Sequence, residues 1–147
     1  MSINERAPAV ARSDVEIAAS PDLVWDVLTA IDRWPTWNPD VKAASLNRPL
    51  AEGTVFRWKA GPGTITSTLL RVEPPRLIAW RGKTFGISAV HVYQLQPRDG
   101  RTLVRSEESW EGLLVRVFRG RMQRSLQHSL DAGVRHLRTE AERRAAG

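Results

Sequence analysis

The chain has 147 residues and no cysteine, and its 22 lysines and arginines outnumber its 16 aspartates and glutamates, for a net charge of +6. This length suits one domain with a substantial core. The missing cysteine excludes disulfides, thiolate metal sites and cysteine nucleophiles. Neither a signal-peptide pattern nor a run of roughly 18 apolar residues is present. We therefore expect a cytoplasmic protein without a transmembrane segment.

The beginning of the chain predicts a short leader followed by a strand. Residues 1–11 contain a proline and several alanines, and we expect them to form a flexible leader to a single domain over residues 12–147. Val15 and Ile17 then alternate with polar residues. This period of two is typical of a strand, which we place over residues 13–19.

A helix signal follows the first strand directly. Ser20 suits the N-cap, Pro21 the first helical position, and Asp22 the positive end of the helix dipole. Residues 32–39 come next and contain two prolines, which exclude a long helix there. We predict one helix after Ser20 and a second, short helical turn after it.

The middle of the chain predicts an antiparallel meander of six strands. Gly- and Pro-containing segments separate apolar runs, and Asp99-Gly100 is a strong hairpin signal because a tight turn needs positive φ. The expected strands are Val41–Asn47, Thr54–Ala60, Thr64–Glu73, Leu77–Arg81, Ile87–Gln96 and Thr102–Glu111.

The end of the chain predicts one uninterrupted amphipathic helix from Leu113 to about Arg144. Its apolar stripe consists of Phe118, Met122, Leu126, Leu130, Val134, Leu137 and Ala141. Such a helix cannot bury its stripe alone, so the strands must receive it. The predicted class is α+β, in which one strongly curved antiparallel sheet could grip the long C-terminal helix, with two short helices after the first strand.

Three segments carry a family resemblance. They are residues 15–28, residues 31–39, and residues 72–82 with Glu108–Gly112 downstream. Together they resemble the START-like, or SRPBCC, superfamily, whose bacterial members include polyketide cyclase/dehydrase and lipid-transport proteins. The resemblance implies a helix-grip fold with a deep cavity between sheet and helix, which in the family takes lipids, sterols, plant hormones or polyketide intermediates. It transfers no catalytic residue to this chain.

Aromatic and long apolar residues are the candidates for the cavity wall. Six tryptophans in a small chain suit a pocket for flat or greasy ligands, with ordinary core packing as the alternative for each one. The predicted ligand-binding residues are Trp37, Phe56, Trp58, Trp80, Trp110, Phe118, Met122, Leu126 and Leu130.

Three polar residues are candidates for chemistry within such a cavity. His91 and Tyr93 share one strand face, so a concave face would give a general base or carbonyl-orienting histidine beside a phenol donor. Glu108 shares a face with Trp110 and could pair with a cavity histidine. For these residues a surface or core role remains the alternative.

These patterns leave three hypotheses for function. The preferred one is binding of a hydrophobic, lipid- or polyketide-like small molecule, and the second is a polyketide cyclase or dehydratase acting on a bound polyketone. The third is a basic surface on the last helix that binds RNA or membrane. We expect no specific nucleic acid, and either a monomer or a homodimer. The three histidines lack metal-ligand spacing, so we predict neither a metal nor a cofactor.

Overall fold

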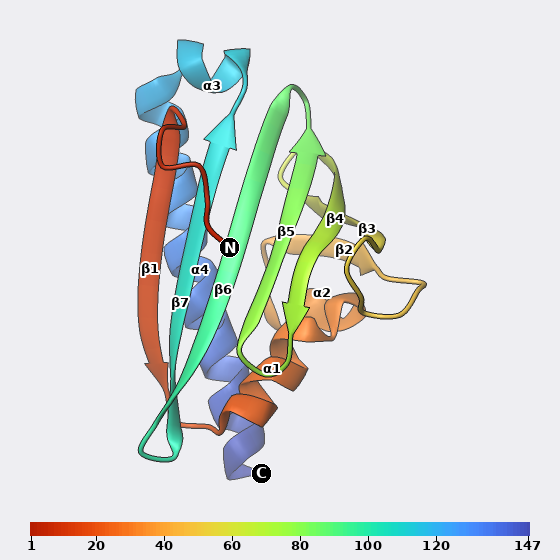
Figure 1. The fold of residues 1–147 in the computed structure, drawn as a ribbon, viewed down its shortest axis with the longest axis vertical. Coiled ribbons are helices and arrows are strands. Elements are labelled where there is room, and N and C mark those ends of the chain that lie inside the picture. Colours follow the sequence, from red (N-terminus) through yellow and green to blue (C-terminus); the bar gives the residue numbers. More distant parts are fainter.

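The computed structural model describes residues 1–147 as one curled, seven-stranded antiparallel sheet with a long C-terminal helix packed against it (Figure 1). The strand order β1-β7-β6-β5-β4-β3-β2 and the helix confirm the predicted helix-grip fold. The elements are β1 (Ala9–Ile17), α1 (Pro21–Thr29), η1 (Ile31–Arg33), α2 (Trp34–Trp37), β2 (Val41–Ser45), β3 (Val55–Ala60), β4 (Gly63–Glu73), β5 (Leu77–Thr84), β6 (Ile87–Arg98), β7 (Arg101–Glu111), α3 (Leu113–Val117) and α4 (Arg119–Ala146).

Local sequence signals set several element boundaries as predicted. The Ser20 side chain caps α1 by accepting a hydrogen bond from the Leu23 backbone N–H at 3.3 Å. Asp99 and Gly100 both have positive φ, which the tight β6–β7 turn requires. None of the helices combines the length and apolar character needed to cross a lipid bilayer.

The prediction of a flexible leader over residues 1–11 is wrong at two places. Residues 9–11 belong to β1, because their backbones pair with β7, and Ala9 and Ala11 are buried beneath α4. Ile3 is also buried, on the opposite face of the sheet, where it packs against β5 and β6. Small alanines give no strand pattern of their own, so tertiary packing decides their conformation.

The prediction of one uninterrupted C-terminal helix is also wrong. Phe118, with φ −108° and ψ 41°, separates α3 from α4. Its side chain is largely exposed instead of lying on the buried stripe, whereas Leu126, Leu130 and Leu137 are buried as predicted. The apolar spacing of three and four residues continues across the break, so periodicity gave no sign of it.

Helix α4 is attached to the free edge of β1 by side chains that repeat every four residues. Each bonds the backbone of an alternate residue along the strand. Four helical residues advance about 6 Å and two strand residues about 6.6 Å, so the two repeats stay in register. The contacts join Arg119 to the Pro8 carbonyl at 3.1 Å, Gln123 to the Val10 carbonyl at 2.6 Å and N–H at 2.9 Å, and Gln127 to the Arg12 carbonyl at 2.9 Å.

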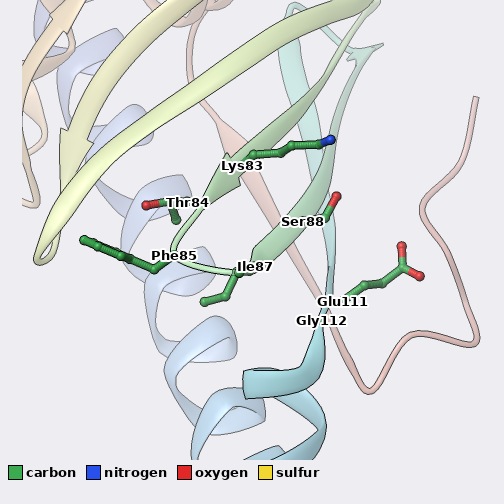
Figure 2. A pocket seen from close by; sticks show the side chains of 8 residues that line it. Lys83, Thr84, Phe85, Ile87, Ser88, Glu111 and Gly112 are labelled. Carbon is green, nitrogen blue, oxygen red and sulfur yellow. The ribbon is translucent and has the colours of Figure 1, made fainter.

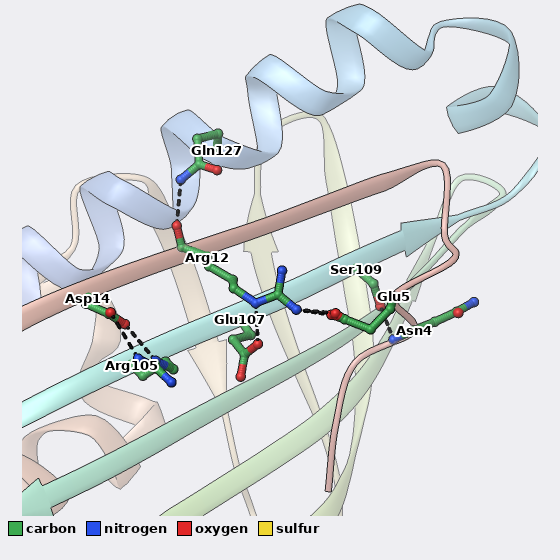
Figure 3. Close-up of polar contacts among 8 residues, drawn as sticks. All are labelled: Asn4, Glu5, Arg12, Asp14, Arg105, Glu107, Ser109 and Gln127. Carbon is green, nitrogen blue, oxygen red and sulfur yellow. Dashed lines mark hydrogen bonds and ion pairs between the residues drawn. The ribbon is translucent and has the colours of Figure 1, made fainter.

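Ion pairs on the opposite face fix the first residues of the chain. Figure 3 shows Arg12 between Glu5 and Glu107, and its Nε lies 2.7 Å from the Glu107 carboxylate. The Asn4 backbone N–H donates to the Ser109 hydroxyl at 3.1 Å. These contacts hold the segment before β1 along the outer face of β7. The inner face remains for α4 and the core.

We predict that Gln123→Ala destabilises the fold by about 1 to 2 kcal/mol, because it removes two hydrogen bonds from the edge of β1. Urea unfolding at neutral pH measures this difference. Gln96→Ala, at an exposed position of β6, is the matched control and should change the free energy of unfolding by less than about 0.5 kcal/mol. Equal effects of the two substitutions would show that the edge contacts contribute nothing.

Candidate functional site

Strands β6 and β7 place the three predicted catalytic residues on the face that α4 covers. His91 lies opposite Glu108 in the antiparallel register, and Tyr93 lies opposite Ser106. A side chain built at Gly133 of α4 would begin 3.7 Å from the Tyr93 hydroxyl. The alternate residues Val90 and Val92 pack with Ile3 on the other face. The polar set therefore faces inward, as the concave-face hypothesis requires.

The inward polar side chains form one hydrogen-bonded array. His91 Nε2 lies 2.7 Å from Ser106 Oγ, and His91 Nδ1 lies 3.3 Å from Glu108 Oε1. The other Glu108 oxygen accepts a hydrogen bond from the Trp110 indole N–H at 2.9 Å. An ionised carboxylate can only accept, so Nδ1 then carries the proton and Nε2 accepts from the Ser106 hydroxyl. The array has the order serine, histidine, carboxylate, indole.

Burial sets the protonation of this array. It lowers the pKa of His91 to about 3 and raises that of Tyr93 to about 12, so both are uncharged at neutral pH. Burial also raises the pKa of Glu108 to about 7, although the Trp110 hydrogen bond opposes part of the rise. The Glu108 side chain keeps 17% of its surface accessible. Glu108, and not His91, is therefore the group suited to proton exchange near neutral pH.

Ser106 is the member of the array that sequence reasoning missed. Its hydroxyl is fully buried and forms a hydrogen bond with His91 Nε2, and this bond fixes the orientation of the imidazole ring. The spacing of Ser106 and Glu108, two residues apart on one strand, was a usable signal that both face the same way. A second buried hydroxyl, Ser67, accepts from the Trp58 indole at 3.1 Å, and no sequence pattern pointed to it.

An aromatic cluster lies beside the array. Trp80 connects the two, since its ring centroid lies 4.8 Å from that of His91 and 5.9 Å from that of Phe56. Trp34 lies at the centre of the cluster, with its ring centroid 5.3 Å from that of Trp58, and its indole N–H donates to the Leu28 carbonyl at 2.9 Å. The cluster fills much of the space in which a deep cavity was expected.

The predicted ligand-binding residues divide by accessibility. Four of them, Phe56, Trp80, Leu126 and Leu130, are buried among other side chains. Phe118 is largely exposed at the end of α3. The partly accessible ones, which border the interior, are Trp37, Trp58, Trp110 and Met122. The Trp37 indole N–H is buried without a hydrogen-bond partner, so a donor remains free there.

Two surface pockets lie away from the polar array. One, of about 630 Å³, lies at the β5–β6 hairpin and the end of β7, and includes Phe85, Glu111 and Gly112 (Figure 2). The other, of about 820 Å³, lies at the β2–β3 connection and touches Phe56. Neither reaches His91. No group of three or more His, Cys, Asp and Glu side chains is placed to hold a metal ion.

Solved structures with the same fold cover most of this chain. An aromatase/cyclase, Zhui, from Streptomyces sp. R1128 has a TM-score of 0.77 at 20% identity, over 92% of this chain and 94% of its own. A START superfamily protein from Mycobacterium smegmatis has a TM-score of 0.72 at 16% identity, over 91% of this chain and 97% of its own. A hypothetical protein from Helicobacter pylori has a TM-score of 0.82 at 14% identity, over 93% of this chain and 90% of its own. At these identities the likeness establishes the fold.

Sequence comparison establishes the family. A search of curated protein sequences finds no significant match. The profile of the family described as polyketide cyclase / dehydrase and lipid transport matches residues 8–142, which is nearly the whole chain. The chain therefore belongs to the polyketide cyclase/dehydrase and lipid-transport family of START-like proteins.

Proposed function

We propose that this protein binds a hydrophobic or aromatic small molecule, of lipid or polyketide type, between the sheet and α4. The observation that carries the proposal is the polar array of His91, Ser106 and Glu108, which faces α4 within an otherwise apolar interior. Burying a carboxyl group is unfavourable, and such groups concentrate where a ligand or a reaction needs them. A ligand carbonyl or hydroxyl would meet Glu108, the accessible end of the array.

Several features of the interior support this position for the ligand. Gly133 presents no side chain toward Tyr93, so the backbone of α4 comes close to the array, and a single added carbon there would already touch the Tyr93 hydroxyl at 3.7 Å. Trp58, Trp110 and Met122 are partly accessible and offer flat or flexible apolar contacts. Because aromatic side chains occupy much of the interior, we infer that entry of a ligand displaces some of them.

The family gives this position a chemical context. The family description names both lipid transport and cyclisation, and the related Streptomyces protein is named an aromatase/cyclase. Both activities handle largely apolar molecules that carry a few oxygen atoms. One interior with a single polar array is consistent with either, so we infer the ligand class and leave the individual compound open to experiment.

The second candidate function is a polyketide cyclase or dehydratase, and the raised pKa of Glu108 favours it. Ionised Glu108 would take a proton from the carbon beside a ketone, while the Tyr93 hydroxyl donates to the enolate oxygen. In a dehydration, protonated Glu108 would then return this proton to the departing hydroxyl, which leaves as water. A polyketone turned over equally well by wild type and by Glu108→Gln would exclude this role.

A neutral fluorescent probe tests the binding proposal. We predict that N-phenyl-1-naphthylamine binds the full chain with enhanced fluorescence, and that Gly133→Leu weakens this binding at least tenfold, because its side chain occupies the proposed ligand position beside Tyr93. Arg135→Leu adds the same side chain at an exposed position of α4 and should leave the dissociation constant unchanged.

Equal binding by both leucine variants would place the probe elsewhere and contradict the proposal. Circular dichroism of each variant shows whether the fold is retained. If Gly133→Leu fails to fold, the smaller Gly133→Ala, whose added carbon makes an ordinary 3.7 Å contact, gives the same comparison with a smaller expected effect. Native mass spectrometry of gently purified protein would then identify a compound that remains bound.

The protonation of Glu108 predicts a pH-dependent stability. Its pKa rises from 4.5 to about 7 on folding, so the native state holds the proton more tightly than the unfolded state. The resulting stabilisation is fully present below about pH 4.5 and is lost as the pH rises through about 7. Glu108→Gln stays neutral throughout. The free energy of unfolding of the variant, taken relative to that of wild type, should therefore be higher at about pH 8 than at about pH 4.5. Urea unfolding at both pH values measures this change.

The control for this measurement is Glu16→Gln on β1, where the side chain is exposed and outside any ion pair. It should change the free energy of unfolding by less than about 0.5 kcal/mol at either pH. If Glu108→Gln follows the control at both pH values, the carboxyl is not in the buried environment that the array requires.

A further inference from the structure

Helix α3 exposes apolar side chains that the rest of the fold does not cover. Leu113 and Val117, one helical turn apart, are 77% and 65% exposed, and Phe118 beyond them is 48% exposed. Val115 points the other way and is fully buried against Ala9 and Leu126. The helix is therefore anchored by one side chain while its outer face meets solvent.

The β5–β6 hairpin lies beside the start of α3. Phe85 at its tip is 68% exposed and lines the same pocket as Gly112, where α3 begins (Figure 2). Gly112 has φ 131°, and any side chain there would collide with the Gly86 carbonyl, so the two segments touch through their backbones. Both lie at the same end of the molecule (Figure 1). We call the exposed apolar side chains Leu113, Val117 and Phe118 the α3 patch.

The α3 patch lies within a one-sidedly basic segment of the chain. Residues 112–130 contain no aspartate or glutamate, and the four arginines among them are all exposed and form no ion pairs. They are Arg116, Arg119, Arg121 and Arg124. At the other end of α4, in contrast, Arg143 and Arg144 both pair with Glu140 at 2.8 Å. The basic charge near α3 is thus free for an external anion.

We propose that the α3 patch docks this protein on the surface of an anionic lipid bilayer. Exposed leucine, valine and phenylalanine gain by leaving water for the acyl boundary, and arginines bind lipid phosphates. No helix is able to cross the bilayer, so the protein would lie on it. Nucleic acid fits less well, because Phe118 alone of the patch can stack on a base, whereas Leu113 and Val117 can neither stack on bases nor hydrogen-bond to their edges.

Vesicle sedimentation of the full chain tests this proposal. The protein should sediment with vesicles of mixed phosphatidylcholine and phosphatidylglycerol, and remain in the supernatant with phosphatidylcholine alone. The double variant Leu113→Ser/Val117→Ser should bind at least about tenfold more weakly, because it loses the inserted apolar groups. The double variant Arg116→Gln/Arg121→Gln should bind anionic vesicles about fivefold more weakly for each arginine removed. Its remaining binding should depend less on salt concentration.

Two matched controls leave the patch intact. Val55→Ser changes a valine that is 43% exposed on β3, and Arg135→Gln/Arg138→Gln removes two exposed arginines further along α4. Both should bind vesicles like wild type. Circular dichroism confirms the fold of each variant, and the four substituted residues Leu113, Arg116, Val117 and Arg121 are all on the surface.

Three results would overturn the proposal. They are no binding to anionic vesicles, equal binding to neutral ones, and equal losses in the patch variants and the controls. A fourth pattern, in which single-stranded RNA binds with the same arginine dependence while Leu113→Ser/Val117→Ser binds vesicles normally, would assign the basic surface to nucleic acid instead. The naphthylamine assay is independent of these outcomes, so the interior ligand site is tested separately.

Discussion

The attachment of α4 to the edge of β1 is the constraint on which the rest of this structure depends. Side chains four residues apart on the helix meet backbone groups two residues apart on the strand, and this fixes the axial position of α4 as well as its direction. The same contacts occupy backbone groups of an edge strand that would otherwise be open to another chain. With α4 in this position, Gly133 lies above Tyr93, and the inward residues of β6 and β7 are covered.

Burial beneath α4 gives the polar array its chemistry. Exposed to water, a histidine, a glutamate and a tyrosine would keep their ordinary pKa values. In this interior the histidine and the phenol stay neutral, and the glutamate is brought close to neutrality. Ser106 and Trp110 satisfy the remaining hydrogen-bonding positions, so that the buried groups are paired. The array is thus a buried polar set whose one adjustable proton is on Glu108.

Sequence patterns predicted the fold well because its signals are local. Alternation defined the strands, Ser20-Pro21 defined the start of α1, and Asp99-Gly100 defined the last hairpin. Two predictions failed. Ala9 enters β1 because it pairs with β7 and packs under α4, a tertiary contact that the local sequence does not show. Phe118 interrupts the helix although the apolar period continues through it, so periodicity could not reveal the break. For the site, alternation placed His91 with Tyr93 and Glu108 with Trp110. The register that joins these pairs to Ser106, and the packing of Trp34 into the interior, depend on partners distant in sequence.

The central claim is that a ligand lies between α4 and the sheet, at the level of Glu108. A crystal structure of the complex with N-phenyl-1-naphthylamine tests it most directly. The account predicts density for the naphthyl ring beside Gly133, with the amine near the Glu108 carboxylate and some of the surrounding aromatic side chains displaced. Density only in the pocket at the β5–β6 hairpin, with the interior array still closed, would contradict it.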